Sequence, residues 1–427
     1  MFKKILNLLA QSSLISLVLV LIFYLIIDAN FLNLKVKIYE NFPNIELRKY
    51  IFNKKSKIEH FKNDYNVKFL PYTQFEKLNY VKKKIIFEND LILKSNHSDN
   101  SIAYKRYNSF FIDFFDDKLL LTDHSGNIYY IEKSELFSNS RELKAKNIKS
   151  DFKAARVFDA FIHSNKLFVS YISDKDGCST INVNNAEINF KSLEFKNFFN
   201  PEICNNTGSP GKIQYFKKGE EEGILLSTSE GIHDKPGLNT QDPNSLFGKI
   251  LFIPFDKEKN FEVYSIGHRV IQGLNVNNNI VISSEHGPRG GDEINRIFYK
   301  KNYGWPVVSL GERYDFKYGN DLLTYKKDHK KNNFVDPLFS FIPSIGISEI
   351  INLPKTFSIY YENHYLASSL NGRSLYFIRF DQDFKKTIST EKVYISNRIR
   401  DMKFSLENNS IVLALEELGE IGILSNN

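Results

Sequence analysis

The residues best suited to chemistry are concentrated between Gly267 and Tyr314. This segment holds an arginine and a glutamine in GHRVIQG, adjacent carboxylates in EHGPRGGDEIN, and an aromatic turn in NYGWP. Arginine binds carboxylates through paired hydrogen bonds, whereas carboxylates beside irregular Gly-Pro loops supply the oxygen ligands that calcium needs. The pattern therefore indicates a site for an anionic ligand and a metal. The alternative is a sheet corner in which Asp and Asn cap turns. Trp305 is expected in the core.

The order and spacing of these motifs resemble the glucose/sorbosone dehydrogenase family of pyrroloquinoline-quinone (PQQ)-dependent sugar dehydrogenases. In that family Arg-x-x-Gln-Gly, Glu-x-Gly-Pro with Asp-Glu-Ile-Asn, and Asn-Tyr-Gly-Trp-Pro follow one another. The likeness continues in TQDPNSLFGKILFIPFD from Thr240, SLNGRSLYFIRFD from Ser369 and NRIRDMKF from Asn397. It covers the chain from about Ala154 to the C-terminus and implies a six-bladed β-propeller.

The resemblance also implies how PQQ would be held. PQQ carries carboxylates and an ortho-quinone, so its pocket needs cations and hydrogen-bond donors. Arg269 and Gln272 match the family's cofactor-binding Arg and Gln, and Arg398 and Arg400 match its later Arg pair. His286 falls on a position that lines the pocket.

Calcium is the second cofactor that the resemblance implies, because in the family it polarises the quinone carbonyl. Gly287 and Pro288 match the residues whose backbone carbonyls bind the ion there. Asp292, Glu293 and Tyr303 match further calcium-linked positions.

The sequence departs from the family where a proton must be removed. The family's catalytic base is a His, and the equivalent position here is Gly208, which cannot accept a proton. Val270 and Asn371 replace an Asn and a Lys that contact the cofactor. Three histidines remain in the matching region: His233, His268 and His286. None is expected to replace the base, since His286 lines the pocket and His268 would point away from its neighbour Arg269 on a strand.

The elements that must position these residues are short strands. From about Ser101 onward, apolar runs alternate with Asn, Asp and Gly turns, and convincing amphipathic helices are nearly absent. A strand–turn–strand unit recurs six times, from Phe111, Phe161, Glu221, Asn277, Glu362 and Glu407. Six units suit a six-bladed propeller, in which each blade buries its faces against its neighbours. A pair of two-sheet sandwiches would show similar strands.

The N-terminus carries a separate signal. Lys3 and Lys4 precede the uncharged stretch 5–27, which is long enough to span a bilayer. Positive charge before the span favours a cytoplasmic N-terminus, so the rest of the chain is expected in the periplasm of a bacterium, anchored at the inner membrane. The alternative is a cleaved signal peptide, but no small-x-small site follows Ile27.

Three regions follow from these signals: a transmembrane anchor at 1–30, a membrane-proximal connector at 31–100 and a propeller at 101–427. The connector contains the strand-like run KKKIIFE at Lys82 to Glu88 and is expected to enter the propeller near its end. Cys178 and Cys204 are expected either as one disulfide or as two free thiols. Their spacing gives no signal for zinc.

The net charge and the departures from the family pattern limit the possible classes of function. The net charge is +7, but acidic and basic residues are interspersed, so no nucleic-acid partner is expected. The leading hypothesis is a membrane-anchored quinoprotein that oxidises an aldose or polyol. The second is a catalytically degenerate propeller that binds a saccharide or a protein, and Gly208 favours it. A calcium-dependent lactonase is a third, weaker alternative.

Overall fold

The computed structural model describes residues 68–69, 78–87, 109–175, 178–201, 211–230, 238–312, 325–416 and 419–426. The chain divides into two units, 1–64 and 65–427, and every described residue belongs to the second. In those ranges no helix is both long and apolar enough to cross a membrane. The expected membrane helix, Cys204, Gly208 and His233 lie outside the described residues, so the predictions about them stay predictions.

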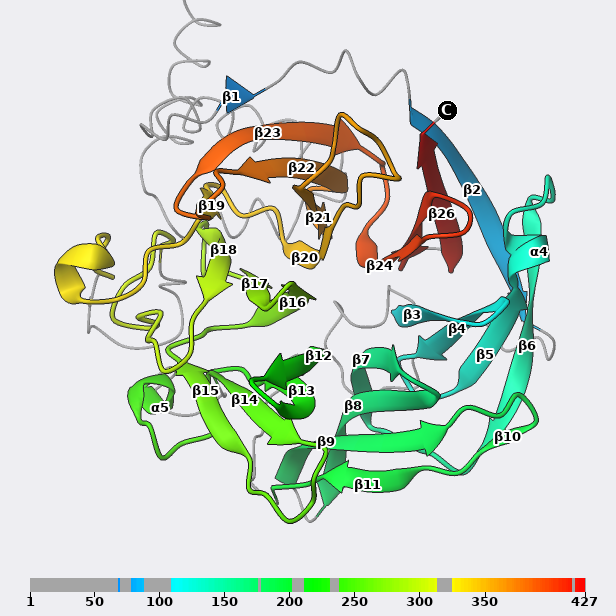
Figure 1. The fold of residues 1–427 in the computed structure, drawn as a ribbon, viewed down its shortest axis with the longest axis horizontal. Helices are drawn as coiled ribbons and strands as arrows, with labels where there is room; N and C mark the ends of the chain where they lie inside the picture. Colours follow the sequence, from blue (N-terminus) through cyan, green and yellow to red (C-terminus); the bar gives the residue numbers. More distant parts are fainter. Residues whose placement is uncertain are drawn as a thin grey trace, which may run out of the picture. The chain divides into compact units, whose positions relative to one another are not determined.

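Six four-stranded blades surround a common axis, which Figure 1 shows end-on. Blade 1 contains β3 (Phe110–Phe115), β4 (Lys118–Asp123), β5 (Ile128–Glu132) and β6 (Glu142–Ser150). Blade 2 contains β7 (Arg156–His163), β8 (Lys166–Lys175), β9 (Cys178–Glu187) and β11 (Lys196–Phe199). Blade 3 contains β12 (Ile213–Lys218), β13 (Glu221–Ser227), β14 (Lys249–Pro254) and β15 (Glu262–Ile266).

Blades 4 to 6 continue the ring in chain order. Blade 4 contains β16 (Ile271–Asn277), β17 (Ile280–Glu285), β18 (Asp292–Ile297) and β19 (Phe339–Phe341). Blade 5 contains β20 (Ile347–Asn352), β21 (His364–Ser369), β22 (Ser374–Phe380) and β23 (Thr387–Tyr394), with the short β1 (Lys68–Phe69) parallel to β23. Blade 6 contains β24 (Ile399–Ser405), β25 (Ser410–Leu415), β26 (Glu420–Asn426) and β2 (Leu78–Phe87).

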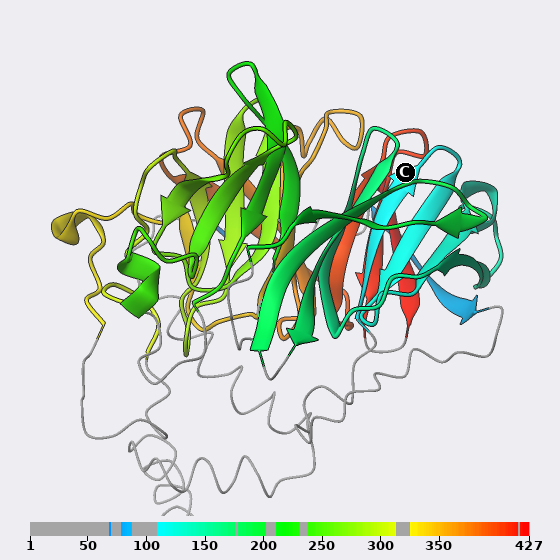
Figure 2. The ribbon, with the colours of Figure 1, turned by 90° about the horizontal axis from the view of Figure 1, so that it is seen from below.

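A few short elements lie between these strands. They are the helices α4 (Lys133–Leu136) and α5 (Leu238–Gln241), the 3-10 helix η3 (Lys330–Asn332), and β10 (Ser192–Leu193), which pairs with β6. In the view of Figure 2, the strands cross the thickness of the ring. The all-β prediction is therefore confirmed for the described residues.

The ring is closed by a strand from the segment expected to be a connector. Leu78–Phe87 (β2) pairs antiparallel with β26 and forms the outer strand of the last blade. Its far end also pairs with β6 of blade 1, from Lys84 opposite Glu142. The propeller therefore includes residues before the expected boundary at 101, because blade 6 needs an outer strand that its own three strands do not supply.

The hydrophobic core is divided into six clusters, one between each pair of neighbouring blades. Strand β25 shows why its sequence SIVLAL is apolar at nearly every position. Ile411 and Leu413 pack toward blade 5, whereas Val412 and Ala414 pack toward blade 1. Because successive side chains of a strand point to opposite faces, a strand that is buried on both faces loses the alternating pattern. This arrangement excludes the sandwich alternative.

Candidate cofactor site

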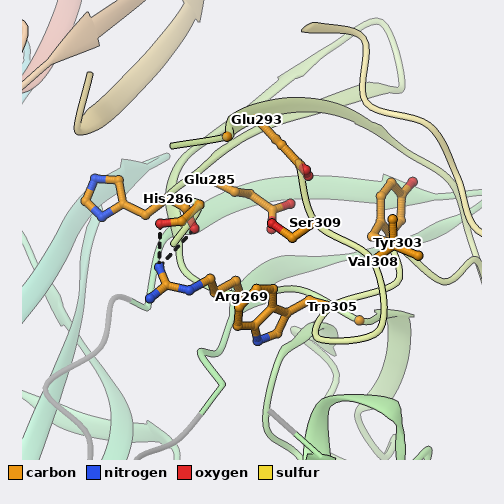
Figure 3. A pocket seen from close by; sticks show the side chains of 11 residues that line it. Arg269, Glu285, His286, Glu293, Tyr303, Trp305, Val308 and Ser309 are labelled. Atoms are coloured by element: carbon orange, nitrogen blue, oxygen red, sulfur yellow. Dashed lines mark hydrogen bonds between the residues drawn. The ribbon is translucent and has the colours of Figure 1, made fainter. Parts of the chain in front are cut away.

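A pocket lies where the loops of blade 4 meet at one end of its strands (Figure 3). Its lining consists of Gly267, Arg269, Glu285, His286, Gly287, Gly291, Glu293, Tyr303, Trp305, Val308 and Ser309. The tight EHGPRGG loop builds one wall. A Cβ atom at Gly287 would collide with the backbone of Gly290 and Gly291, so only glycine fits there.

Arg269 is held by groups on three sides. Its Nη1 donates to the backbone carbonyls of His286 at 3.1 Å and Gly287 at 2.9 Å. Its guanidinium carbon lies 5.2 Å from the ring centre of Trp305, a cation–π contact. Its Nε lies 3.4 Å from a carboxylate oxygen of Glu230, and Trp305 Nε1 donates to the other oxygen of Glu230 at 2.7 Å. Trp305 is buried, so its predicted place in the hydrophobic core is confirmed. Its ring is also part of the site.

The second arginine group comes from blade 6. Arg398 Nε and Arg400 Nε donate to the two oxygens of Glu416, at 2.6 and 2.7 Å. Arg400 Nη1 also donates to Gln272 Oε1 on β16, at 3.3 Å. Although burial would raise the pKa of Glu416, Arg400 and Arg398 lower it to about 2. The structure thus brings Gln272 to Arg398 and Arg400, which lie more than a hundred positions later in the sequence.

His286 points away from the Arg269–Trp305 side of the pocket (Figure 3). Burial lowers the pKa of His286 to about 4; Asp292 opposes this shift, and Arg269 and Arg400 reinforce it. Its Nε2 is buried and has no hydrogen-bond partner among the described residues. His286 is therefore a neutral residue of the pocket lining whose Nε2 can take part in one further hydrogen bond, and its predicted role toward the cofactor stays a prediction.

Asp292 and Tyr303 use their polar atoms within the protein. Asp292 Oδ1 accepts from Gly287 N at 3.0 Å, and Oδ2 accepts from Ile345 N at 2.9 Å and Ile347 N at 3.0 Å. The Tyr303 hydroxyl donates to the carbonyl of Arg296 at 2.6 Å. Both side chains hold the loops of the site together. Because their oxygen atoms already form hydrogen bonds within the protein, the geometry does not favour them as metal ligands.

Glu285 and Glu293 form the acidic side of the pocket. Glu285 Oε1 accepts from Ser283 Oγ at 2.9 Å and Asn295 Nδ2 at 3.0 Å, and it lies 2.9 Å from His268 Nδ1. Although burial would raise the pKa of Glu285, His268 and these hydrogen bonds lower it. Burial and the nearby charge of Glu285 raise the pKa of Glu293 to about 8.

Calcium fits this acidic side better than it fits the glycine–proline loop. Asn295 Nδ2 donates to Glu285 Oε1 at 3.0 Å and to Glu293 Oε2 at 3.3 Å, so the two carboxylates are close neighbours. Neighbouring carboxylates supply hard oxygen ligands of the kind that calcium needs. The Gly287 carbonyl, by contrast, already faces the guanidinium of Arg269. The described residues hold no group of three or more His, Cys, Asp or Glu arranged for a metal.

Three carboxylates of the site had no role assigned from the sequence: Glu230 and Glu416 were not singled out, and Glu285 was noted only as part of EHGP. Each follows the second strand of its blade, after β13, at the end of β17 and after β25 respectively. Asp123 ends β4 in the same way. This recurrence of an acid after the second strand of a repeat is the signal that would have found them.

The fold and the site define a six-bladed β-propeller. Arg269, Arg398 and Arg400 lie at one end of its axis, and we call this end the arginine mouth. The family model described as Glucose / Sorbosone dehydrogenase matches residues 108–422. The chain therefore belongs to the glucose/sorbosone dehydrogenase family, as the sequence motifs predicted.

Individual relatives agree with this assignment. An uncharacterised protein of Synechocystis, slr1608, is 33% identical over 222 residues, covering 47% of this chain and 52% of the relative. The aldose sugar dehydrogenase YliI of Escherichia coli is 32% identical over 140 residues, covering 29% of this chain and 36% of the relative. The chain thus spans about half the length of the first relative and about a third of the second.

Solved structures show the same fold. A glucose dehydrogenase crystal structure superposes with a TM-score of 0.62 at 20% identity, covering 74% of this chain and 96% of that one. The PQQ-bound aldose sugar dehydrogenase of Streptomyces coelicolor gives a TM-score of 0.51 at 16% identity, covering 81% of this chain and 98% of that one.

Proposed function

We propose that this protein is a PQQ-dependent dehydrogenase that oxidises an aldose or a related polyol. The observation that carries the proposal is the gathering of Arg269, Arg398, Arg400 and Gln272 around one mouth of the propeller. Their guanidinium groups suit the carboxylates of PQQ, and the bound quinone would supply the electron acceptor.

The placement of the guanidinium groups supports an anionic ligand. Arg398 and Arg400 lie on either side of Glu416, and Arg269 faces Glu230. Guanidinium groups bind carboxylates through paired hydrogen bonds, and PQQ carries carboxylates.

Calcium and location belong to the same proposal. Glu293 and Glu285 would hold the ion, whose positive charge would favour the ionised form of Glu293. The hydrophobic stretch 5–27 would anchor the chain in a bacterial inner membrane, with the propeller in the periplasm. Partners would then be a small sugar and the lipid bilayer.

A second candidate is a binding module for saccharides or proteins that has lost catalysis. Gly208 at the position of the family's base favours it, together with Val270 and Asn371. In such a module the arginine mouth would bind a ligand or stabilise the structure, but it would not take part in catalysis.

Calorimetric titration of the protein in detergent with PQQ and millimolar calcium tests the proposal. The wild type should bind with micromolar or tighter affinity, and the R398A/R400A variant should not bind. The K330A/K331A variant removes two exposed cations from η3 and serves as the control. Absence of binding by the wild type would overturn the dehydrogenase in favour of the binding module.

A further inference from the structure

The chain lacks the histidine that its relatives use to remove a proton, so another group of the site must do so if a sugar is oxidised. A general base has to be unprotonated at working pH, basic enough to accept a proton, and close to the reacting group. The titratable residues at the mouth can be compared on these three requirements.

The histidines of the site do not meet them. His268 is fully buried between Ser265 Oγ and Glu285 Oε1, at 2.8 and 2.9 Å from its two ring nitrogens. It therefore has no nitrogen left for a substrate. His286 has a pKa of about 4, so it is a weak base.

Three of the four glutamates are also unsuitable. Glu416 is held by two arginines that lower its pKa to about 2, which leaves it with little basicity. Glu285 Oε1 accepts from Ser283 and Asn295 and lies against His268, and these groups lower the pKa of Glu285, which makes it a weaker base. Glu293 has a pKa of about 8 and carries a proton at neutral pH in the absence of a cation.

Glu230 satisfies the requirements. Its carboxylate lies beside both Arg269 and Trp305, which line the pocket, and its side chain is 16% exposed. Burial raises its pKa, which makes it a stronger base than an ordinary carboxylate, while Arg269 and the Trp305 N–H keep the anion stable. Its backbone N–H donates to the Arg269 carbonyl at 2.9 Å, so the two residues are tied together.

We propose that Glu230 is the general base of this protein and accepts the proton of the sugar hydroxyl. The proposal rests on the proposed dehydrogenase function. In the step, the hydroxyl O–H bond breaks and its proton passes to a Glu230 oxygen, while a carbonyl forms at the carbon. The hydrogen on that carbon leaves with its electron pair as hydride, which the ortho-quinone accepts. The Glu230 proton is then released to solvent.

The first test measures turnover with an aldose and an artificial electron acceptor in PQQ-loaded protein. E230Q keeps the shape and the hydrogen bond to Trp305 but removes the base, so turnover should fall about 10²- to 10⁴-fold. PQQ affinity, measured by calorimetry, should be equal or tighter, because a negative charge is removed beside Arg269. E220Q, on the exposed hairpin between β12 and β13, is the matched control and should be unchanged.

Two further measurements separate a base from a merely structural residue. Formate added to E230G should restore part of the turnover, since a small carboxylate can take the vacated place. In quinone-free protein, the emission of Trp305, the single tryptophan of the chain, should change as acid protonates Glu230. The E230Q variant should lack this transition.

The outcomes are distinct. If the wild type binds PQQ and E230Q keeps turnover within threefold, the assignment of Glu230 is overturned and the dehydrogenase stands. Two results together would also overturn the assignment. In the first, E230Q is inactive and formate does not restore turnover to E230G. In the second, the Trp305 emission of the wild type does not change with acid. If the wild type itself fails to bind PQQ, the proposed function falls first.

Discussion

Lys212 of blade 3 and Glu349 of blade 5 form a buried ion pair, with 2.5 Å between Nζ and Oε2. Gly273 on β16 of blade 4 makes this contact possible, because a Cβ atom there would lie 2.9 Å from Glu349 Oε1. Lys212 also pairs with Asp159 of blade 2 at 2.8 Å. One ammonium group thus joins three blades near the axis, beneath the arginine mouth.

Removing this ammonium group should destabilise the whole ring. In K212M, the buried carboxylates of Asp159 and Glu349 lose their ion pair and keep only the charge of Lys403. We therefore expect a loss of about 3 kcal/mol, at the lower end of the range for a broken buried pair. The free energy of unfolding in guanidinium chloride measures this loss. K82M, which breaks an exposed pair with Glu420, should leave the midpoint unchanged. An equal loss of unfolding free energy in K212M and K82M would contradict a special role for the ion pairs of Lys212.

Glu416 should make stability depend on acid pH. Its pKa in the folded protein, about 2, is below its ordinary value of 4.5, because Arg400 and Arg398 outweigh the effect of burial. The stabilisation is therefore fully present above pH 4.5 and is lost as the pH falls toward 2. The loss amounts to at most about 3 kcal/mol. The free energy of unfolding, measured between pH 2 and 6, should fall in this way for the wild type but not for E416Q. If the free energies of the two proteins change in parallel with pH, the prediction is refuted.

A chelator should lower the thermal stability if the acidic side of the pocket holds calcium. A ligand present at a hundred times its dissociation constant stabilises the folded state by about 2.7 kcal/mol. EGTA should therefore lower the unfolding temperature of calcium-loaded wild type, and E293Q, which loses one charged ligand, should respond much less. A D292N variant that responds like the wild type would agree with the backbone role of Asp292. A full response of E293Q would exclude Glu293 as a ligand.

The sequence predicted the loop motifs of this site but not the carboxylates that balance them. The segments around Arg269 and Arg398 are recognisable because several residues of specific type stand together. Glu416 is the first of two adjacent acids after a strand, and its partners become apparent only when β24 and β25 pair. A single carboxylate has no local pattern, so only comparison between the repeats would have indicated it.

Strand β2 was difficult for a different reason. Its sequence was recognised as strand-like, but its partner β26 lies more than three hundred residues away. Burial alternates imperfectly along β2, because Val81 and Lys82 are both exposed. In addition, a lysine takes a buried position: Lys83 Nζ donates to the Ser138 carbonyl at 2.5 Å. Pairing over such a distance is decided by the geometry of ring closure and not by local propensity.

Lys249 should control the position of Trp305. Its fully buried Nζ donates to the carbonyls of Asn239 at 3.1 Å, Thr240 at 2.9 Å and Phe247 at 2.5 Å. Thr240 Oγ1 in turn donates to the Trp305 carbonyl at 2.5 Å. K249M removes the ammonium donor from these carbonyls, although Thr240 keeps a bond from Gly267 N and Asn239 keeps one from Asp242 N. We expect a loss of about 2 kcal/mol and a red-shifted Trp305 emission.

The control for this prediction is K259M, an exposed lysine that pairs with Glu221. It should change neither the unfolding free energy nor the emission. Acrylamide quenching gives a second measure, because a loosened α5 loop admits the quencher to the indole. If K249M is destabilised while the Trp305 emission and quenching stay as in the wild type, Lys249 stabilises the loop without positioning the tryptophan.

The uncharged stretch 5–27 should anchor the protein in a membrane. Two arginines at its centre, in L17R/L21R, each add about 2.5–3.5 kcal/mol to the free energy of insertion. The wild type should therefore remain in the membrane fraction after a carbonate wash, whereas the variant should be released. N-terminal sequencing of the membrane-bound protein distinguishes the anchor from a cleaved signal peptide, because only an uncleaved chain begins before Lys3. Release of the wild type by carbonate would refute the anchor and, with it, the proposed attachment of the propeller to the bilayer.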